Sequence, residues 1–160
     1  MIFNNDDFRR CMGHFTTGVT VVTTVKGSGN LCGMTVNSFT SLSLEPPLIL
    51  FSIDKNAHSH DRFFGSSDFT VNILSQSQKN LSAYFANPSL VKWEDVDYSV
   101  NNNFIKIDDC LAYVFCEKET VYEGGDHSII IGKVIDIETV PDKKPLTYYK
   151  GKYRKIGDML

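Results

Sequence analysis

The chain has 160 residues, which suits one domain of ordinary size, and residues 1–160 are expected to form a single domain. Hydrophobic residues make up 42% of the chain and charged residues 22%, a balance that favours a packed core over disorder. The net charge of −3 gives no reason to expect a nucleic-acid partner, and no apolar run approaches the roughly 18 residues that a membrane-spanning helix requires.

The amino terminus and the cysteines indicate a cytoplasmic protein. Residues 1–7 lack the basic start and the apolar run of a secretion signal. The cysteines are widely spread and form no Cys-x-x-Cys pair. Since a chain with this many apolar residues has no need of a disulfide framework, we expect reduced thiols in a cytoplasmic compartment.

The start of the chain predicts a helix followed by a β-hairpin. Residues 5–15 are expected to be helical, with Asn5 or Asp6 as the N-cap. Residues 18–26 are dense in β-branched side chains and predict a strand. A turn of glycine, serine and asparagine then leads to a second strand near residues 31–36.

The middle of the chain predicts two strands and two helices. Strands are expected over residues 47–53 and 68–74, and helices over residues 57–65 and 76–85. In the second of these helices Leu81 and Phe85 lie one turn apart, so they share a face.

The last part of the chain predicts two long strands. Residues 86–103 show little periodicity and are expected to run over the surface. Strands are predicted near residues 110–122 and 127–140, joined across residues 124–126, and a basic, aromatic tail follows. Six or so strands with few helices, and without strand–helix–strand alternation, predict a mainly β fold that forms a closed or partly open barrel.

Residues 33–41 form the most unusual polar segment of the chain. They place hydroxyls, an amide and accessible backbone at a strand end, where they are suited to bind the polar edge of a heterocycle. The alternative interpretation is an ordinary polar turn, since serine, threonine and asparagine favour turns.

A second segment, residues 52–60, runs from a strand end toward a predicted helix start, where backbone N–H groups favour an anion. Contacts to a phosphate are expected from Ser52, Lys55, Asn56 and Ser59. His58 and His60 lie in the same segment, but no third ligand is evident, so no metal site is expected.

Two further segments have a functional and a structural interpretation. The turn before His127 either projects this side chain over a ligand cleft or serves only to join two strands. Residues 145–155 interleave basic and aromatic side chains, as in single-strand nucleic-acid binding or in a solvated, partly docked tail. The Gly-x-Gly-x-x-Gly, phosphate-loop and hydrolase-elbow motifs are missing from the sequence, so an enzyme of this kind would depend on a cofactor for the difficult step.

Taken in order, six segments resemble the short-chain NAD(P)H:flavin reductase family, whose fold is an FMN-binding split β-barrel. The segments cover nearly the whole chain and are residues 15–24, 33–41, 43–48, 71–78, 125–127 and 149–153. The resemblance implies hydride transfer from NADH or NADPH to FMN, with FAD as a possible flavin. It also implies a homodimer and a separate flavin-dependent monooxygenase that receives the reduced flavin.

The resemblance also implies roles for individual residues. The isoalloxazine is expected to lie against Met34, Thr35, Val36, Asn37, Ser38, Phe39, Thr40 and Ser41. The ribityl phosphate is expected at Ser52, Lys55, Asn56, Ala57 and Ser59, and Phe85 is expected near the flavin. The nicotinamide nucleotide is expected at His127, Tyr148, Tyr149, Lys150 and Gly151, with His127 as a positioning residue and not a general base.

Three alternatives keep a related fold and change the role. The barrel would hold FMN tightly as an electron carrier, or it would act as a flavin-sensing or nucleotide-sensing module without turnover. A pyridoxine-type oxidase is less favoured, because the sequence has no clear basic cluster for a second phosphorylated substrate. The segment that ends at His127 favours the reductase.

Overall fold

A computed structural model of the chain describes residues 2–27 and 29–157. The helices are α1 (Asn5–Met12), α2 (His60–Phe64) and α3 (Lys79–Phe85), with short 3-10 turns at Gln76–Gln78, Pro88–Leu90 and Trp93–Asp95. The strands are β1 (Thr17–Gly18), β2 (Thr20–Lys26), β3 (Asn30–Val36), β4 (Thr40–Leu44), β5 (Pro47–Asp54), β6 (Asp68–Ile73), β7 (Tyr98–Asn101), β8 (Phe104–Ile107), β9 (Ala112–Gly124), β10 (His127–Thr139), β11 (Thr147–Tyr149) and β12 (Lys152–Arg154). Within the described residues no helix has the length and apolar character needed to span a bilayer.

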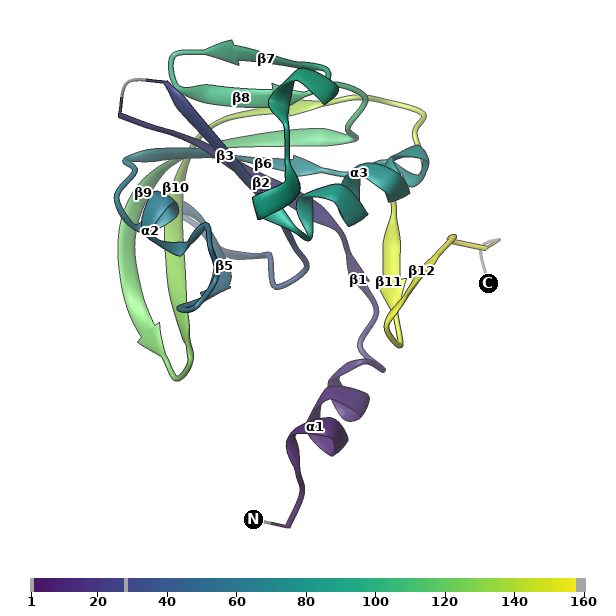
Figure 1. Cartoon of the computed structure of the whole chain (residues 1–160). Helices are drawn as coiled ribbons and strands as arrows, with labels where there is room; N and C mark the ends of the chain where they lie inside the picture. Colours follow the sequence, from purple (N-terminus) through teal and green to yellow (C-terminus); the bar gives the residue numbers. More distant parts are fainter. Residues whose placement is uncertain (1, 28, 158–160) are drawn as a thin grey trace.

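The main body is a seven-stranded antiparallel sheet in the order β3-β2-β6-β9-β10-β5-β4 (Figure 1). Strands β3 and β4 are its two edges, yet only residues 37–39 separate them in sequence. Because so short a link reaches at most about 14 Å, the two edges must come together at this end. The sheet therefore curls into a barrel that stays open between β3 and β4, which confirms the predicted split β-barrel.

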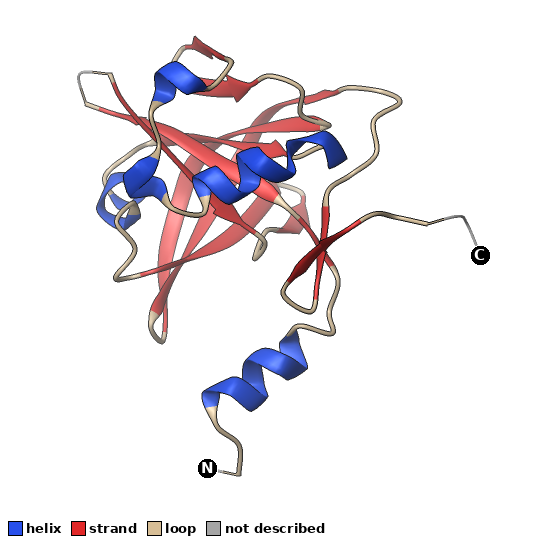
Figure 2. Cartoon of the chain, turned by 45° about the vertical axis from the view of Figure 1, so that its right-hand side comes forward, coloured by secondary structure: helices blue, strands red, loops and turns tan. Residues whose placement is uncertain are grey.

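Two apolar clusters stabilise the barrel. One fills its interior, where the rings of Phe63 and Phe69 pack edge-on against Phe51, and all three side chains are at most 1% exposed. The other lies between the sheet and α3 and includes Leu74 and Phe85. Figure 2 shows α3 lying across the outside of the strands. The expected shared face of Leu81 and Phe85 is confirmed, since both belong to this second cluster.

A buried amide ties β8 to the barrel. The Asn72 side chain is fully buried, accepts a hydrogen bond from the Ile107 backbone N–H at 2.9 Å, and donates to the Val21 carbonyl at 3.1 Å and the Thr23 hydroxyl at 3.0 Å. Buried polar groups are retained when they are satisfied in this way. Asn72 therefore has a structural role within the segment that resembles the family.

The expectation of an irregular excursion over residues 86–103 is wrong in part. Strands β7 and β8 form a hairpin there, with Asn102 and Asn103 as its two turn residues at φ of 47° and 69°. Asparagine tolerates this left-handed conformation, and two such residues make the turn that twists correctly for a hairpin. The Asn-Asn pair was the sequence signal for this turn.

Other boundaries differ from the sequence-based predictions. The N-cap of α1 is Asn4, whose side chain accepts from the N–H groups of Asp6 and Asp7, and α2 begins at His60, not at residue 57. The tail expected to be solvated and partly docked forms strands, because β11 and β12 pair with each other and β11 pairs with β1. The turn predicted between β2 and β3 includes Ser28, which lies outside the described residues; its glycines Gly27 and Gly29 have the positive φ expected of such a turn.

The amino-terminal helix projects from the barrel. Figures 1 and 2 show α1 extending away from the main body, toward the side where the β11–β12 hairpin and the tip of β9–β10 also lie. None of its residues is buried. An isolated helix this short is unstable in water, so its docking contacts determine whether it forms.

Candidate functional site

The opening of the barrel presents unpaired backbone groups. In the described part of the chain, residues 37–39 take part in no backbone–backbone hydrogen bond, because β3 ends before them and β4 begins after them. Asn37 and Ser38 are exposed, and Phe39 is half-buried. The flanking residues Thr40 and Ser41 are exposed on the edge strand β4. This segment therefore offers N–H donors and carbonyl acceptors to a ligand, as the sequence predicted.

Side-chain contacts bring residues 34–41 together with residues 52–59. The Ser38 hydroxyl donates to the Ser52 carbonyl at 3.1 Å and accepts from the Ser52 N–H at 3.0 Å. The Ser59 hydroxyl contacts the Met34 sulfur at 3.1 Å. Two segments proposed separately from the sequence are thus in direct contact beside the opening.

Lys55 joins this surface to the turn between β9 and β10. Its backbone N–H donates to the Asp126 carbonyl at 3.0 Å, its ammonium donates to the Gly125 carbonyl at 2.8 Å, and it forms an ion pair with Glu123. The loop after β5 is therefore fastened to the turn that precedes His127. In this conformation the Lys55 ammonium is already partnered, so a phosphate would have to compete for it.

His127 opens β10 and lies against a carboxylate. Its Nδ1 is 2.7 Å from Asp126 Oδ1, and this hydrogen bond is the main reason that the pKa of the Asp126 carboxyl is held below its usual value. The contact orients the imidazole with Nδ1 toward the carboxylate, which leaves Nε2 available to a ligand. A hollow of about 510 Å³ lies beside it, lined by Asn5, Phe8, Arg9, Ser52, Gly124, Asp126, His127 and Ile129.

Tyr148 lines a different hollow from His127. A smaller hollow of about 230 Å³ is lined by Val19, Thr35, Asn37, Ser82, Ala86, Tyr148 and Tyr153. The buried Ser82 fixes two of these side chains: its carbonyl accepts from the Thr35 hydroxyl at 2.6 Å, and its hydroxyl lies 2.9 Å from the Tyr153 hydroxyl. The hollow that contains Tyr148 and the one that contains His127 therefore have no lining residue in common.

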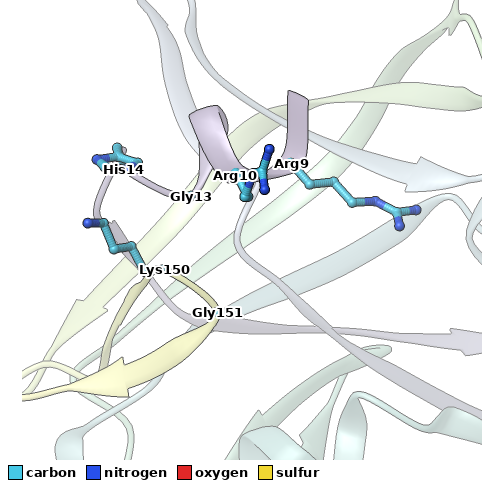
Figure 3. Close-up of a pocket in the computed structure, with 6 residues that line it drawn as sticks. All are labelled: Arg9, Arg10, Gly13, His14, Lys150 and Gly151. Carbon is cyan, nitrogen blue, oxygen red and sulfur yellow. The ribbon is translucent and has the colours of Figure 1, made fainter. Parts of the chain in front are cut away.

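Lys150 and Gly151 form the turn of the β11–β12 hairpin and meet the end of α1. Their φ angles of 49° and 71° make a two-residue turn, and the Lys150 N–H donates to the Gly13 carbonyl at 2.8 Å. Tyr149, which is half-buried, packs edge-on to the His14 ring at 6.2 Å. The hollow under this junction is drawn in Figure 3 and has a volume of about 460 Å³.

Several expected ligand contacts lie below the surface. Phe85 is fully buried and packs against Trp93, with its ring directly beneath Gly33, where a Cβ would approach it to 2.6 Å. It therefore supports β3 from below and does not line an open site on this chain. Val36 and Ser59 are also buried.

The proposed helix start at the phosphate segment is also weaker than expected. Helix α2 has only five residues, and Asn56 and Ala57 form a tight turn in which their N–H groups donate to the Asp54 side chain and carbonyl. His60 contacts the Ser128 hydroxyl at 3.1 Å and Asp61 at 3.3 Å, which gives it a structural role. The N-cap of α2, Ser59, makes no side-chain cap hydrogen bond, so this short helix start is not capped by the chain itself.

The structure adds residues that the sequence did not identify. Asn5, Phe8, Arg9 and Arg10 of α1 line the hollows that contain His127 or Lys150. Nothing in the local sequence of α1 signals this, because the docking depends on a contact with residues near the opposite end of the chain. The surface as a whole fits a flat heterocycle with a phosphate tail: an unpaired backbone segment, hydroxyls, and basic side chains meet at the opening.

Comparison with known proteins gives one consistent result. A family model described as a flavin reductase-like domain matches residues 12–157. The FMN reductase (NADH) SmoA of Agrobacterium fabrum is 41% identical over 155 residues, which is 96% of this chain and 87% of that protein. The reductase subunit HsaB of a flavin-dependent monooxygenase from Mycobacterium tuberculosis is 38% identical over 93% of this chain and 81% of that protein.

A solved structure extends the likeness to three dimensions. The NADH:FAD oxidoreductase of Streptomyces globisporus, solved with NAD and FAD fragments, superposes with a TM-score of 0.90 at 36% identity, covering 96% of this chain and 93% of that one.

Proposed function

Because the chain belongs to the flavin reductase-like domain family, we propose that it takes a hydride from NADH and passes it to FMN. The observation that carries this proposal is the opening of the barrel, where the unpaired backbone of residues 37–39 lies on one surface with Ser52 and, through Lys55, with the turn that holds His127. NADH is preferred over NADPH as the donor because two relatives, SmoA and an FAD reductase of Streptomyces globisporus, are named as NADH enzymes. FMN is the first flavin to test, and FAD is the alternative, since one relative is named an FAD reductase.

Hydride transfer makes few demands on acid–base groups. Flavin, when bound, supplies the atom that accepts the hydride, so no side chain has to accept it. The residues of this chain then have to hold two ligands within about 3–3.5 Å of each other and exclude water. This agrees with a site made of backbone groups and hydroxyls, in which the His127–Asp126 pair positions a ligand and has no proton to transfer.

Each part of the site has a task in this proposal. Residues 37–39 hydrogen-bond the polar edge of the heterocycle, and residues near Ser52 and Lys55 hold the phosphate end. His127, fixed by Asp126, directs Nε2 toward the nicotinamide nucleotide. The Tyr148 side chain forms the opposite wall of the opening.

We also propose a homodimer and a separate monooxygenase that receives the reduced flavin. Four large apolar side chains on or beside α1 are more than half exposed, although such side chains are usually buried. They are Phe3, Phe8, Met12 and Phe15. A second copy of the chain would cover them. The monooxygenase is suggested by relatives named as reductase components of such enzymes.

Steady-state oxidation of the donor tests the reaction. Purified protein is mixed with NADH or NADPH and free FMN, and absorbance at the donor band is followed. A reductase gives sustained turnover that depends on both ligands. Tight flavin binding without turnover would instead indicate the electron carrier or the sensor. Light scattering on the same sample gives the mass in solution, for which we expect twice 18.0 kDa.

A further inference from the structure

The hollow between α1 and the β11–β12 turn has a basic lining that the proposed reaction does not yet use. It is lined by Arg9, Arg10, Gly13, His14, Lys150 and Gly151. Figure 3 shows the turn beneath the carboxyl end of α1, with basic side chains extending from both elements. Among the residues that the structure describes, no carboxylate lines this hollow, although the chain as a whole carries a net charge of −3.

The surrounding sequence strengthens this local charge. Residues 146–157 contain no acidic residue, and their basic residues are Lys150, Lys152, Arg154 and Lys155. Arg9 lies 3.9 Å from Asp6, and Arg10 pairs with Asp7, but both arginine side chains are about four-fifths exposed. Exposed pairs of this kind contribute little, so a more highly charged anion can replace the carboxylates as partner.

The basic groups are held together by specific contacts. The Lys150 N–H donates to the Gly13 carbonyl at 2.8 Å, and the His14 ring packs against Tyr149. These contacts place Lys150 beside the last turn of α1 in spite of the repulsion between like charges. Positive charge concentrated in a concave surface raises the local concentration of anions.

Arg9 connects this hollow to the one beside His127. It lines both of them, and Ser52 and His127 line the second. Arg9 is therefore shared by the hollow beside His127 and the hollow that contains Arg10 and Lys150.

We propose that the hollow formed by Arg9, Arg10, His14 and Lys150 is a subsite for the phosphoryl groups of the nucleotide substrate. This inference rests on the proposed reductase function. The phosphoryl groups belong either to the pyrophosphate of the nicotinamide donor or to the phosphate of the flavin, and the chemistry that binds them is the same: guanidinium and ammonium donors to phosphate oxygens.

Direct binding tests the subsite without turnover. Isothermal titration calorimetry measures the Kd of NAD⁺, inorganic pyrophosphate and FMN, each with wild type, an Arg9→Ala/Arg10→Ala double variant and Lys150→Asn. Asparagine keeps the positive φ of position 150 while it removes the charge. We expect the double variant to raise the Kd of pyrophosphate and of at least one nucleotide by about tenfold, which corresponds to about 1.4 kcal/mol.

Two controls separate charge from structure. Arg9→Lys/Arg10→Lys keeps the charge and is expected to restore most of the pyrophosphate affinity. Lys133→Ala removes an exposed basic side chain on β10, outside these hollows, and is expected to leave every Kd within about twofold. Because α1 has no buried residue, the variants are expected to keep the thermal midpoint of the barrel.

The arms of the experiment identify the source of the phosphate. Weaker binding of NAD⁺ with an unchanged affinity for FMN assigns the subsite to the nicotinamide donor. Weaker binding of FMN assigns it to the flavin. Unchanged affinity for all three ligands in both variants would overturn the proposal. The steady-state assay of the wild type is independent of these titrations, so a failure of the subsite is distinguishable from a failure of the reductase function.

Discussion

The barrel and the structures around its opening differ in how their residues are held. In the barrel, side chains such as Val21, Phe51 and Phe69 are at most 1% exposed and every strand of the main sheet is paired. Around the opening, α1 has no buried residue and residues 37–39 lack backbone partners within the described chain. The barrel thus provides most of the folding free energy, and the opening provides accessible polar groups for ligands. Substitutions in the two regions should separate stability from binding.

The largest effect is expected for Phe85→Ala. Truncation of a fully buried phenylalanine destabilises a core by about 3–5 kcal/mol, because it removes apolar burial and leaves a cavity. Urea denaturation followed by circular dichroism measures the change in free energy of unfolding. Leu90→Ala, at a side chain that is 62% exposed and lies outside α1, is the control and should stay within about 0.5 kcal/mol.

The same variant tests the placement of Phe85. If FMN affinity fell severely while the free energy of unfolding stayed near that of wild type, Phe85 would be a ligand contact and the burial described above would not hold in solution.

A somewhat smaller loss is expected for Gly132→Ala on β10. A Cβ at this position would meet the Phe69 ring and lie 3.0 Å from the Cys116 Cβ, so the barrel interior has no room for it. Overpacking of this kind destabilises by about 1–3 kcal/mol. Gly18→Ala, where no atom lies within 4 Å of the added Cβ, is expected to be nearly neutral. Equal thermal midpoints for the two variants would refute the packing explanation.

His127→Ala is expected to change binding and to leave stability alone. Loss of an orienting hydrogen bond of about 1 kcal/mol should raise the KM for NADH about fivefold, while the Kd for FMN changes less than twofold. Steady-state kinetics and flavin fluorescence give the two values. An unchanged KM would remove the role of His127 in positioning the nicotinamide nucleotide.

The smallest effect on stability is expected from modification of the thiols, which differ between the barrel and α1. Cys11 on α1 is exposed, whereas burial raises the pKa of Cys32 to about 11 and that of Cys110 and Cys116 to about 12. At pH 8 a thiol reagent should therefore modify one cysteine in the native protein and all four after unfolding, as counted by mass spectrometry. Rapid labelling of a second cysteine in the native protein would contradict the burial of Cys32, Cys110 and Cys116.

These pKa values also predict the direction of an alkaline effect. Unfolded thiols ionise near pH 9, and the buried thiols resist ionisation until higher pH. The buried thiols therefore make their full contribution to stability below pH 9. The free energy of unfolding should fall as the pH rises from 9 toward 12.

The sequence predicted the long strands well and the short hairpins poorly. The β9 and β10 strands have long β-favouring runs and a Gly-Gly-Asp turn, so local pattern was sufficient. The β11–β12 hairpin has strands of three residues and uses Lys150 in a left-handed conformation, for which lysine gives no sequence signal. Its formation depends on pairing with β1, a long-range contact.

For the site, sequence reasoning proposed segments that the structure brings together, but it did not predict their arrangement. The contacts of Ser38 with Ser52 and of Lys55 with Gly125 arise only when the sheet curls and brings strand ends together. Arg9 and Arg10 were missed because their position depends on the contact between Gly13 and Lys150. The burial of Phe85 was also invisible, since a helix face that points to a core and one that points to a ligand have the same pattern.

Anaerobic stopped-flow absorbance tests the central claim most directly, namely that the groups at the opening hold donor and flavin together for hydride transfer. Protein with FMN is mixed with NADH, and the flavin band is followed with wild type and with His127→Ala. We expect rapid bleaching with wild type, and with the variant a bleaching rate that approaches the same limit only at higher NADH concentration. A bound flavin that stays oxidised with NADH and with NADPH would contradict the claim.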